Sequence, residues 1–528
     1  MSTNKELQRA ELHTTIWRIA NDLRGSVDGW DFKSYVLGVM FYRFISENLT
    51  RYINQGEIEA QKEAGVPENE IEFDYAELED TDIDPETRDA IIQEKGFFIY
   101  PSQLFQNVLK RSENNNNLNI DLTSIFRSIE GSAIGKGSQS DMQGLFSDVD
   151  LNSNKLGITT MDRCKKISLL LKAISEFEIG DLQDQTIDTF GDAYEYLMTM
   201  YASNAGKSGG EFFTPQEVSE LLVKIAIKDR TTVDKVYDPA CGSGSLLLKF
   251  AKLLGKDGVT GGYYGQEINV TTYNLCRINM FLHNINFEKF DIACADTLLK
   301  PIHDDAFDAI VSNPPYSIKW EGDSNPLLIN DPRFSPAGVL APKSKADLAF
   351  TMHILSRLAS NGTAAIVEFP GVLYRGGAET TIRKYLVENN YVDTVIQLPP
   401  DLFYGVSIAT CIIVLRKNKA DNSILFIDAS DKFVRTGNKN KLTQENIEEI
   451  YALYRDRSNN DFHSILVDKK NIEENEFNLA VSAYIEQEEA SSQIDISKLN
   501  ESINTIVNES NSLREKILQF ITPEKTNE

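Results

Sequence analysis

The sequence predicts an α/β protein in which a helical N-terminal domain comes first, a helix-covered parallel sheet follows, and a helical tail ends the chain. Three observations support this class. Apolar residues recur at helical spacing in the first part, seven short β-rich runs alternate with helical segments after about residue 185, and the end of the chain carries an apolar seam. With 528 residues, 41% of them hydrophobic, the chain can form several packed cores.

Residues 1–180 are expected to form the helical domain. Residues 5–55 have apolar side chains every three or four positions, with a turn at 25–29, and the same spacing returns at Ile167, Leu170, Leu171 and Ile174. Between these segments the chain is strongly acidic. Residues 57–95 hold 15 acidic side chains and three basic ones, so nearly half of the net charge lies in this one stretch.

Residues 181–485 are expected to form the sheet domain. Alternation of short β-rich runs with helical segments is typical of a parallel sheet covered by helices. The runs lie at residues 235–240, 262–268, 290–296, 307–315, 362–370, 392–399 and 409–417.

Residues 486–528 are expected to form a C-terminal coiled-coil tail. Steps of three and four residues join Ile496, Leu499, Ile503, Ile506, Ser510, Leu513, Ile517 and Phe520, and only Ser510 interrupts the apolar seam. A short seam of this kind fits a helix that docks on a partner subunit. A helix that docks on its own chain fits the same pattern, and both interpretations stay open.

Charge and composition exclude several classes of protein. The formal net charge is −26, which argues against a nucleic-acid binder that relies on general basicity. The chain has neither a signal-peptide pattern nor an apolar run long enough to span a membrane, so a cytoplasmic protein is expected. Its five cysteines and five histidines show no ligand spacing, so we expect no disulfide framework and no metal site.

A glycine-rich turn follows the first predicted strand, in the segment DPACGSGSLLL (238–248). Gly242 and Gly244 allow a ligand to approach the backbone closely, at the free N–H groups of the helix that follows. The dinucleotide fingerprint fails because Leu247 stands where its third glycine is required. Asp238, directly before the turn, suits a ligand that carries an amine.

Acidic residues also stand at the ends of the next two predicted strands. Glu267 lies where a carboxylate accepts ribose hydroxyls in nucleotide-binding units, and Asp296 follows the third strand. Because ligands bind outside the carboxyl ends of parallel strands, Asp238, Glu267 and Asp296 should line one crevice. Acceptors for an amine, a ribose and an adenine amino group together match S-adenosylmethionine.

The fourth predicted strand ends in Ser312-Asn313-Pro314-Pro315-Tyr316. The two prolines stop the strand and stiffen the turn, so that the Asn313 amide oxygen and the Pro314 carbonyl can face one point. Two acceptors placed together suit an amino-group donor, and Tyr316 offers a flat face for a flipped base.

An Asn-Pro-Pro-Tyr motif after an Asp-x-x-x-Gly-x-Gly turn resembles the N6-adenine DNA methyltransferases. The segment GGEFFTPQEVSELL (209–222) resembles, more narrowly, the modification (M) subunit of type I restriction-modification enzymes. Further similar segments lie at 30–46, 345–355, 369–386, 398–415 and 477–485, so the resemblance covers nearly the whole chain. It implies a Rossmann-like domain dependent on S-adenosylmethionine.

The resemblance also implies roles for individual residues. Its cofactor-binding positions are Glu211, Phe212, Phe213, Thr214, Pro215, Gln216, Asp238, Gly242, Ser243, Gly244, Ser245, Glu267 and Asp296. Its catalytic positions are Asn313, Pro314, Pro315 and Tyr316, with Tyr316 stacking on the target base. Phe403 is expected to stack from the other side, and Tyr404 is its competitor for that role.

The partners that the resemblance implies are other subunits and DNA. We find no basic or repeated module that could read a DNA sequence, although residues 431–441 are locally basic. The expected partners are a specificity (S) subunit that chooses the site, a second copy of the modification subunit, a motor-nuclease restriction (R) subunit, and double-stranded DNA with a flipped adenine. No membrane partner is expected.

Other functions fit the sequence less well. Gly206-Lys207-Ser208 fails as a phosphate-binding loop because Tyr201 replaces the required glycine, and no proline precedes a cysteine, as cytosine C5 methylation would require. Release-factor glutamine and RNA methylases also use Asn-Pro-Pro-Tyr. The long helical N-terminus and the C-terminal seam argue against them. A binding or scaffold subunit with a vestigial site is the alternative from another class.

Overall fold

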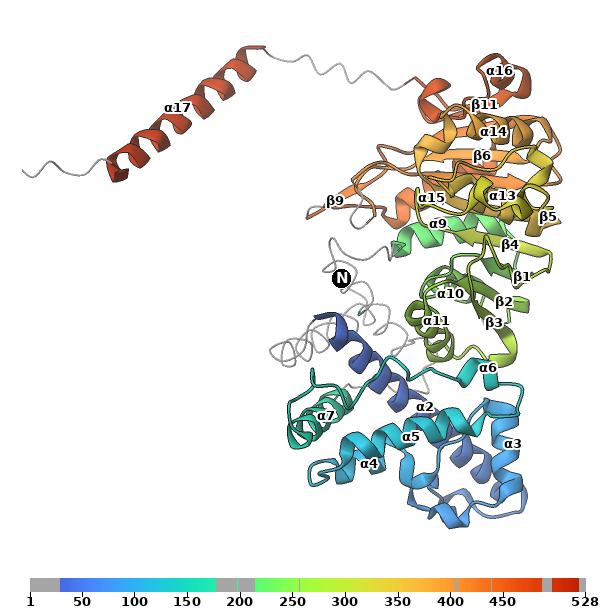
Figure 1. Ribbon diagram of the computed structural model, residues 1–528, viewed down its shortest axis with the longest axis vertical. Helices are drawn as coiled ribbons and strands as arrows, with labels where there is room; N and C mark the ends of the chain where they lie inside the picture. Colours follow the sequence, from blue (N-terminus) through green and yellow to red (C-terminus); the bar gives the residue numbers. More distant parts are fainter. Residues whose placement is uncertain are drawn as a thin grey trace, which may run out of the picture. The chain divides into compact units, whose positions relative to one another are not determined.

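The computed structural model describes residues 29–176, Leu197, 214–255, 257–403, 407–437, 439–486 and 496–521. The chain divides into two compact units, residues 1–485 and residues 486–528. In the first unit a group of helices is followed by a sheet with helices against it (Figure 1).

Helices make up the first part of the described chain. They are α2 (Gly29–Glu63), α3 (Pro85–Lys95), α4 (Phe105–Ser112), α5 (Leu118–Ser132), α6 (Gln139–Met142) and α7 (Thr160–Ser175). The apolar residues of α7 that predicted it, Ile167, Leu170, Leu171 and Ile174, are all buried. The expected helix before residue 29 lies outside the described residues, and α2 continues eight residues beyond the expected end at 55.

The acidic stretch 57–95 forms the end of α2, short 3-10 turns and α3. Side-chain caps explain its regular structure. Asp84 accepts hydrogen bonds from the backbone N–H groups of Glu86 and Thr87, both at 2.9 Å, and Pro85 stands at the first helical position of α3. Gly96 ends the helix in the left-handed conformation.

A nine-stranded sheet forms the centre of the second part. Its strands are β1 (Val233–Asp238), β2 (Val259–Glu267), β3 (Phe290–Cys294), β4 (Phe307–Ser312), β5 (Leu358–Glu368), β6 (Val392–Gln397), β7 (Cys411–Arg416), β8 (Ser423–Asp428) and β11 (Ser464–Asp468). They lie in the order β11-β8-β6-β7-β5-β4-β1-β2-β3. All seven predicted runs are strands.

Helices pack against this sheet, as Figure 1 shows. They are α9 (Gln216–Ile227), α10 (Ser245–Leu254), α11 (Val270–Leu282), α12 (Pro326–Ile329), α13 (Asp347–Arg357), α14 (Ala378–Glu388), α15 (Gln444–Asp456) and α16 (Lys469–Glu474). Adjacent residues of β1 enter different cores: Val236 packs with apolar residues of α9 and α10, and Tyr237 with residues of α13 and α14. The sheet is therefore covered on both faces.

The expectation of a wholly parallel sheet was wrong at two strands. From β3 to β5 the strands are parallel, but β7 runs antiparallel to both β5 and β6, and β11 runs antiparallel to β8. Among the described residues no helix separates β6 from β7. A strand that returns without a helical crossover pairs in the antiparallel direction.

The helical part is joined to the sheet part by a buried arginine on α11. The Arg277 guanidinium donates hydrogen bonds to the carbonyls of Ser140, Asp141 and Gln143, at 2.7, 3.1 and 3.0 Å. Its side chain is 1% exposed and lies over the Tyr273 ring. These contacts attach α6 to the helix that also supports the glycine-rich turn.

Among its described residues, the second unit contains the helix α17 (Ile496–Ile521). Of the predicted seam, Ile503, Ile506, Ser510 and Leu513 are described with their side chains, and all four are exposed. The predicted helix is confirmed, whereas its coiled-coil pairing stays a prediction. No helix in the described part of the chain has the length and apolar composition to cross a membrane.

Candidate active site

The glycine-rich turn lies between β1 and α10, with both glycines in the left-handed region. Gly242 has φ 52° and Gly244 has φ 80°, and Gly244 is the N-cap of α10, whose first residue is the buried Ser245. A Cβ on Gly244 would lie 2.7 Å from the Cys276 sulfur, whereas a Cβ on Gly242 would meet nothing within 4 Å. The turn is thus tight on its α11 side and open at Gly242.

Hydrogen bonds with α11 and β2 hold the glycine-rich turn in place. The Asn279 side chain on α11 donates to the Ser243 carbonyl at 2.9 Å, and the Cys241 N–H donates to the Gln266 carbonyl on β2 at 3.1 Å. Asn279 was not predicted, because only the packing of α11 against the turn brings it there.

Asp238 lies buried at the carboxyl end of β1, with 1% of its surface exposed. One carboxylate oxygen, Oδ1, accepts from the Ala240 N–H at 3.0 Å and from the Ser312 hydroxyl at 2.8 Å. The other, Oδ2, is buried and has no hydrogen-bond partner in the described structure. Burial raises the pKa of Asp238 to about 7, against the lowering effect of these two hydrogen bonds.

Glu267 ends β2 and braces the glycine-rich turn. Its Oε2 accepts from the Gly242 N–H at 3.0 Å, and its Oε1 accepts from the Asn269 N–H at 2.8 Å. The strand register places Asp238 opposite Gly265 and Glu267 opposite Cys294, so the ends of β1, β2 and β3 lie along one edge, as predicted.

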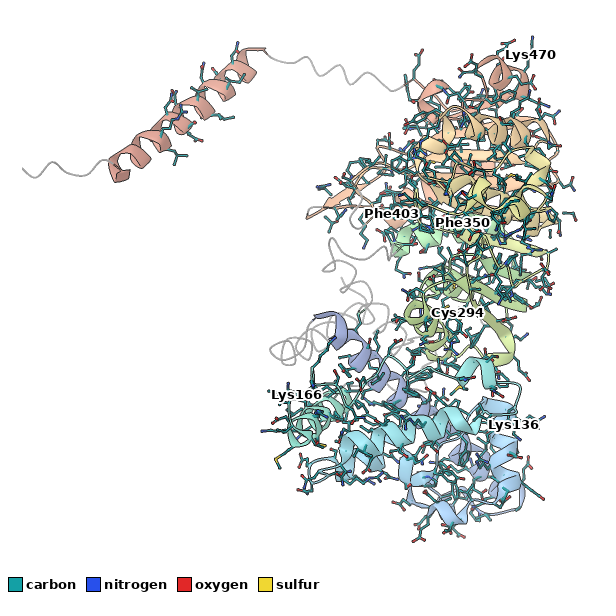
Figure 2. All side chains as sticks on the ribbon, in the orientation of Figure 1. Lys136, Lys166, Cys294, Phe350, Phe403 and Lys470 are labelled. Atoms are coloured by element: carbon teal, nitrogen blue, oxygen red, sulfur yellow. The ribbon has the colours of Figure 1, made fainter. Side chains whose placement is uncertain are left out.

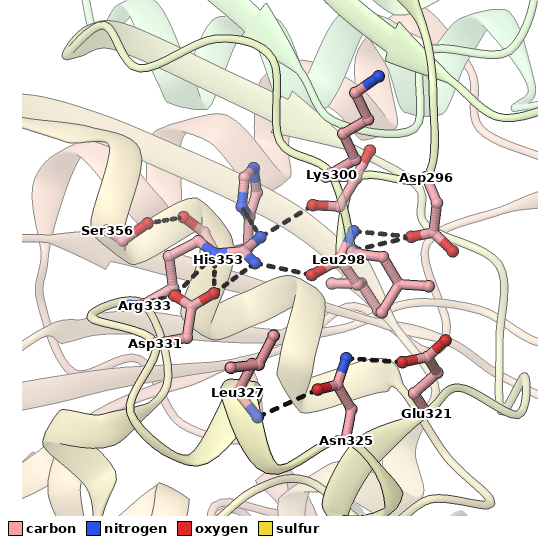
Figure 3. Close-up of polar contacts among 12 residues, drawn as sticks. Asp296, Leu298, Lys300, Glu321, Asn325, Leu327, Asp331, Arg333, His353 and Ser356 are labelled. Atoms are coloured by element: carbon pink, nitrogen blue, oxygen red, sulfur yellow. Dashed lines mark hydrogen bonds and ion pairs between the residues drawn. The ribbon is translucent and has the colours of Figure 1, made fainter.

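Asp296 follows β3 and caps its own loop. Its Oδ1 accepts from the N–H groups of Leu298 and Leu299, at 2.9 and 3.2 Å, and Figure 3 shows the second oxygen pointing away from them. The same loop is held by the buried Arg333, which donates to the carbonyls of Thr297 and Leu298 at 2.8 and 2.7 Å (Figure 3). Arg333 was not predicted, since it is distant in the sequence.

Asn313 follows β4 and lies beside the predicted cofactor segment. Its side chain is 7% exposed; the amide nitrogen donates to the Thr214 hydroxyl at 3.0 Å, and the amide oxygen accepts from the Tyr316 hydroxyl at 2.5 Å. Pro314 is buried and Pro315 partly buried. Because Ser312 bonds to Asp238 and Asn313 to Thr214, the two predicted motifs meet in the structure.

The cofactor segment is described only from Thr214 onward. Thr214 and Pro215 are buried, and Gln216 begins α9 with its amide nitrogen buried and without a hydrogen-bond partner in the described structure. The predicted positions Glu211, Phe212 and Phe213 lie outside the described residues, as does Tyr404.

Phe403 lies against Tyr316, the other predicted stacking residue. The two ring centroids are 6.5 Å apart and the ring planes meet at 82°, an edge-to-face contact. Phe403 is only 2% exposed. Its position is labelled in Figure 2. A base that stacks between the two rings therefore requires one of them to move.

Two buried carboxyl groups lie behind the Asn-Pro-Pro-Tyr turn. Asp347, at the start of α13, accepts from the N–H of Ser317 at 2.9 Å, and Ser317 has φ 50°, so this bond holds a strained turn. Glu368, at the end of β5, accepts from the Thr351 hydroxyl at 2.9 Å. Burial raises the pKa of Glu368 well above its usual value, and the negative charge of the nearby Asp347 raises it further.

A further candidate site residue, the exposed Ile268 beside Glu267, was not predicted from the sequence. Ile268 follows Glu267 directly and is 65% exposed, although it lies at the end of a buried strand. A large apolar side chain next to a predicted ribose acceptor is the signal that could have found it.

Comparison with known proteins decides the family. The protein-family model described as N-6 DNA Methylase matches residues 185–493. A second family model, described as HsdM N-terminal domain, matches residues 12–174. The type I restriction enzyme MpnII methylase subunit of Mycoplasma pneumoniae is 49% identical over 99% of this chain and 97% of its own length. This chain belongs to the N-6 DNA methylase family, among the type I methylase subunits.

Other matches agree with this family. The methyltransferase subunit of a type I restriction-modification system from Streptococcus thermophilus has a solved structure with a TM-score of 0.79, 35% identity, and coverage of 90% of this chain and all of that one. The MjaVIII methylase subunit of Methanocaldococcus jannaschii is 32% identical over 69% of this chain and 64% of its own length. The methylase subunit described here is accordingly an adenine-specific DNA methyltransferase.

Proposed function

We propose that this methylase subunit transfers the methyl group of S-adenosylmethionine to the N6 amino group of adenine, at a DNA sequence chosen by a separate specificity subunit. The observation that carries the proposal is the contact between two motifs. The Ser312 hydroxyl bonds to Asp238, and the next residue, Asn313, bonds to Thr214. A cofactor held by Asp238 would therefore lie beside an amino group held by Asn313.

The residues around the glycine-rich turn fit S-adenosylmethionine. The buried Oδ2 of Asp238 lacks a partner in the described structure, and the ammonium of the methionine moiety would supply one. The space at Gly242 admits a ligand against the backbone. Glu267 would accept the ribose hydroxyls, and the free oxygen of Asp296 the adenine amino group, with Ile268 covering the adenine ring.

The Asn313 amide oxygen and the Pro314 carbonyl would hold the target amino group by accepting hydrogen bonds from its two N–H groups. The lone pair of an aromatic amine is delocalised into the ring, so the amine is a poor nucleophile. Two accepted hydrogen bonds favour localising that pair on nitrogen, and the fixed turn orients it. When bound, the cofactor supplies an activated methyl group. The Thr214 bond fixes the Asn313 amide with its oxygen available.

Tyr316 would stack on the flipped adenine. Its hydroxyl bonds to the Asn313 oxygen at 2.5 Å, and a carbonyl oxygen can accept a second hydrogen bond, so an adenine amine can join or replace that contact. Phe403 would form the opposite wall after it moves from its buried position.

The partners proposed are those of a type I restriction-modification complex in the cytosol. They are a specificity subunit, a second modification subunit, a motor-nuclease restriction subunit, and double-stranded DNA. The net charge of −26 explains why this chain would not hold DNA by itself. Helix α17 would dock on the specificity subunit through its exposed apolar residues.

Cofactor binding and methyl transfer, measured with and without the specificity subunit, test this function. We expect the isolated subunit to bind S-adenosylmethionine, and N6-methyladenine to form in DNA only after the specificity subunit is added. A scaffold with a vestigial site would assemble without forming N6-methyladenine, and an RNA or protein methylase would act without the specificity subunit. Either result would exclude the proposed function.

A further inference from the structure

We propose that the β9–β10 hairpin, described at residues 433–437 and 439–442, contacts the phosphates of the DNA duplex beside the target adenine and sets the position of Phe403. The inference rests on the proposed function. The hairpin consists of β9 (Val434–Thr436) and β10 (Lys439–Lys441), which pair with each other and not with the main sheet. Figure 1 shows β9 extending away from the sheet.

The hairpin has a net positive charge, whereas the chain as a whole has a net negative charge. The chain has 79 acidic and 53 basic residues, whereas residues 433–442 contain Arg435, Lys439 and Lys441 and no acid. All three residues of β9 are exposed. Lys441 is exposed and forms no ion pair among the described residues. By contrast Lys432, just before the hairpin, pairs with Glu449 at 3.4 Å and Asp431 at 3.9 Å.

The hairpin is attached to the segment that carries Phe403. The Lys439 ammonium donates to the Phe403 carbonyl at 2.7 Å, and the Asn440 side chain donates to the Pro400 carbonyl at 2.8 Å. Arg435 pairs with the Asp401 carboxylate at 3.1 Å. A two-stranded hairpin is only marginally stable alone, so these contacts are what fix it. A shift of the hairpin would therefore act on the Phe403 backbone through the Lys439 bond.

The other end of the hairpin lies near the cofactor segment. Burial raises the pKa of Glu217, in the first turn of α9. The chain just beyond Lys441 contacts the same helix, because the Gln444 side chain donates to the Glu220 carboxylate at 2.9 Å. Glu217 follows Gln216 of the predicted cofactor segment. The hairpin thus borders the crevice on the side of Phe403 and on the side of α9.

This position suits a contact with DNA. A flipped adenine that reaches Asn313 brings its own phosphate and the flanking phosphates to the rim of the crevice. A chain of net negative charge repels phosphates on average, so a contact with them is favoured at an element of the opposite charge. A phosphate at Lys441 would stabilise the hairpin near the duplex while Lys439 holds the Phe403 backbone, so that duplex binding and the opening of the base site are coupled.

Two lysine substitutions test the phosphate contact. One removes Lys441, which forms no ion pair among the described residues, and the other removes Lys432, which is paired. The complex with the specificity subunit is prepared with Lys441→Gln and, as the matched control, Lys432→Gln, and binding of a cognate duplex is measured from 50 to 200 mM salt. We expect Lys441→Gln to weaken binding by roughly five- to tenfold and to reduce the slope of log affinity against log salt by about 0.9. Lys432→Gln should leave both unchanged. Equal slopes for Lys441→Gln and wild type would overturn the contact.

The link to Phe403 is tested with Lys439→Met at saturating duplex that carries 2-aminopurine at the target position. We expect a several-fold lower fluorescence than with Lys441→Gln, because the flipped base is held less often, while affinity for S-adenosylmethionine stays at the wild-type value. Wild-type fluorescence in Lys439→Met would overturn the link. Wild-type complex that forms no N6-methyladenine would instead contradict the proposed function, so the two failures can be told apart.

Discussion

At the scale of single residues, Asp238 is the side chain on which the cofactor assignment depends most. It is buried, one of its oxygens lacks a partner in the described structure, and its pKa is about 7. Below pH 7 the carboxyl of the cofactor-free protein is protonated and neutral, so it attracts an ammonium only after it loses that proton. Cofactor binding should therefore weaken as the pH falls through 7.

The measurement is calorimetric titration of the isolated subunit with S-adenosylmethionine from pH 5.5 to 7.5. In this range an α-amino group with a pKa of about 7.8 stays mostly protonated. We expect the affinity to fall toward tenfold per pH unit below 7. Asp238→Asn should bind more weakly and show little pH dependence. A pH-independent affinity in the wild type would contradict the role given to Asp238.

Gly244 provides a second prediction at this scale. Gly244→Ala puts a Cβ at φ 80° and within 2.7 Å of the Cys276 sulfur, whereas Gly135→Ala puts one at φ 77° into open space. The left-handed conformation costs about 1–2 kcal/mol in each variant, and overpacking adds about 1–3 kcal/mol for Gly244 alone. Denaturant unfolding should therefore show the larger loss of stability for Gly244→Ala; equal losses would mean that the turn can relax.

At the scale of elements, α11 joins the helical domain to the cofactor turn. Arg277→Met would leave three carbonyls around α6 without their donor, one in a buried hydrogen bond and two in part-buried ones, and an unsatisfied buried acceptor costs about 1–3 kcal/mol. We expect a loss of about 3 kcal/mol or more in the free energy of unfolding, with faster amide exchange at 139–143. Arg163→Met, whose side chain bonds to the Gly157 carbonyl at a more exposed position, is the control and should lose about 1 kcal/mol.

The sequence predicts the helices and strands better than it predicts which of them contact one another. All seven β-rich runs and α7 follow from local pattern, and the edge shared by Asp238 and Glu267 follows from a general property of parallel sheets. The direction of β7 depends on how the chain returns after β6. The contacts of Ser312, Arg333 and Asp347 join residues 30 to 74 positions apart, so no local pattern could indicate them.

At the scale of the whole molecule, the tail is expected to serve assembly and not chemistry. Deleting residues 490–528 should reduce formation of the complex with the specificity subunit while leaving cofactor affinity unchanged. Ile506→Ser, in the exposed seam of α17, should weaken assembly, and Asn508→Ser on the opposite face should not. Size-exclusion chromatography with light scattering checks both. Full assembly by the truncated chain would show that the tail docks elsewhere.

In the proposed mechanism Asn313 holds the adenine amino group beside the cofactor, so the Asn313→Ala variant should lose methyl transfer. The variant is assembled with the specificity subunit, and N6-methyladenine in cognate DNA is quantified alongside binding of S-adenosylmethionine. We predict that cofactor binding persists and that methyl transfer falls by at least a hundredfold, because the oriented acceptor is lost. Methylation at the wild-type rate in a complex that still binds its cofactor and DNA would contradict the account.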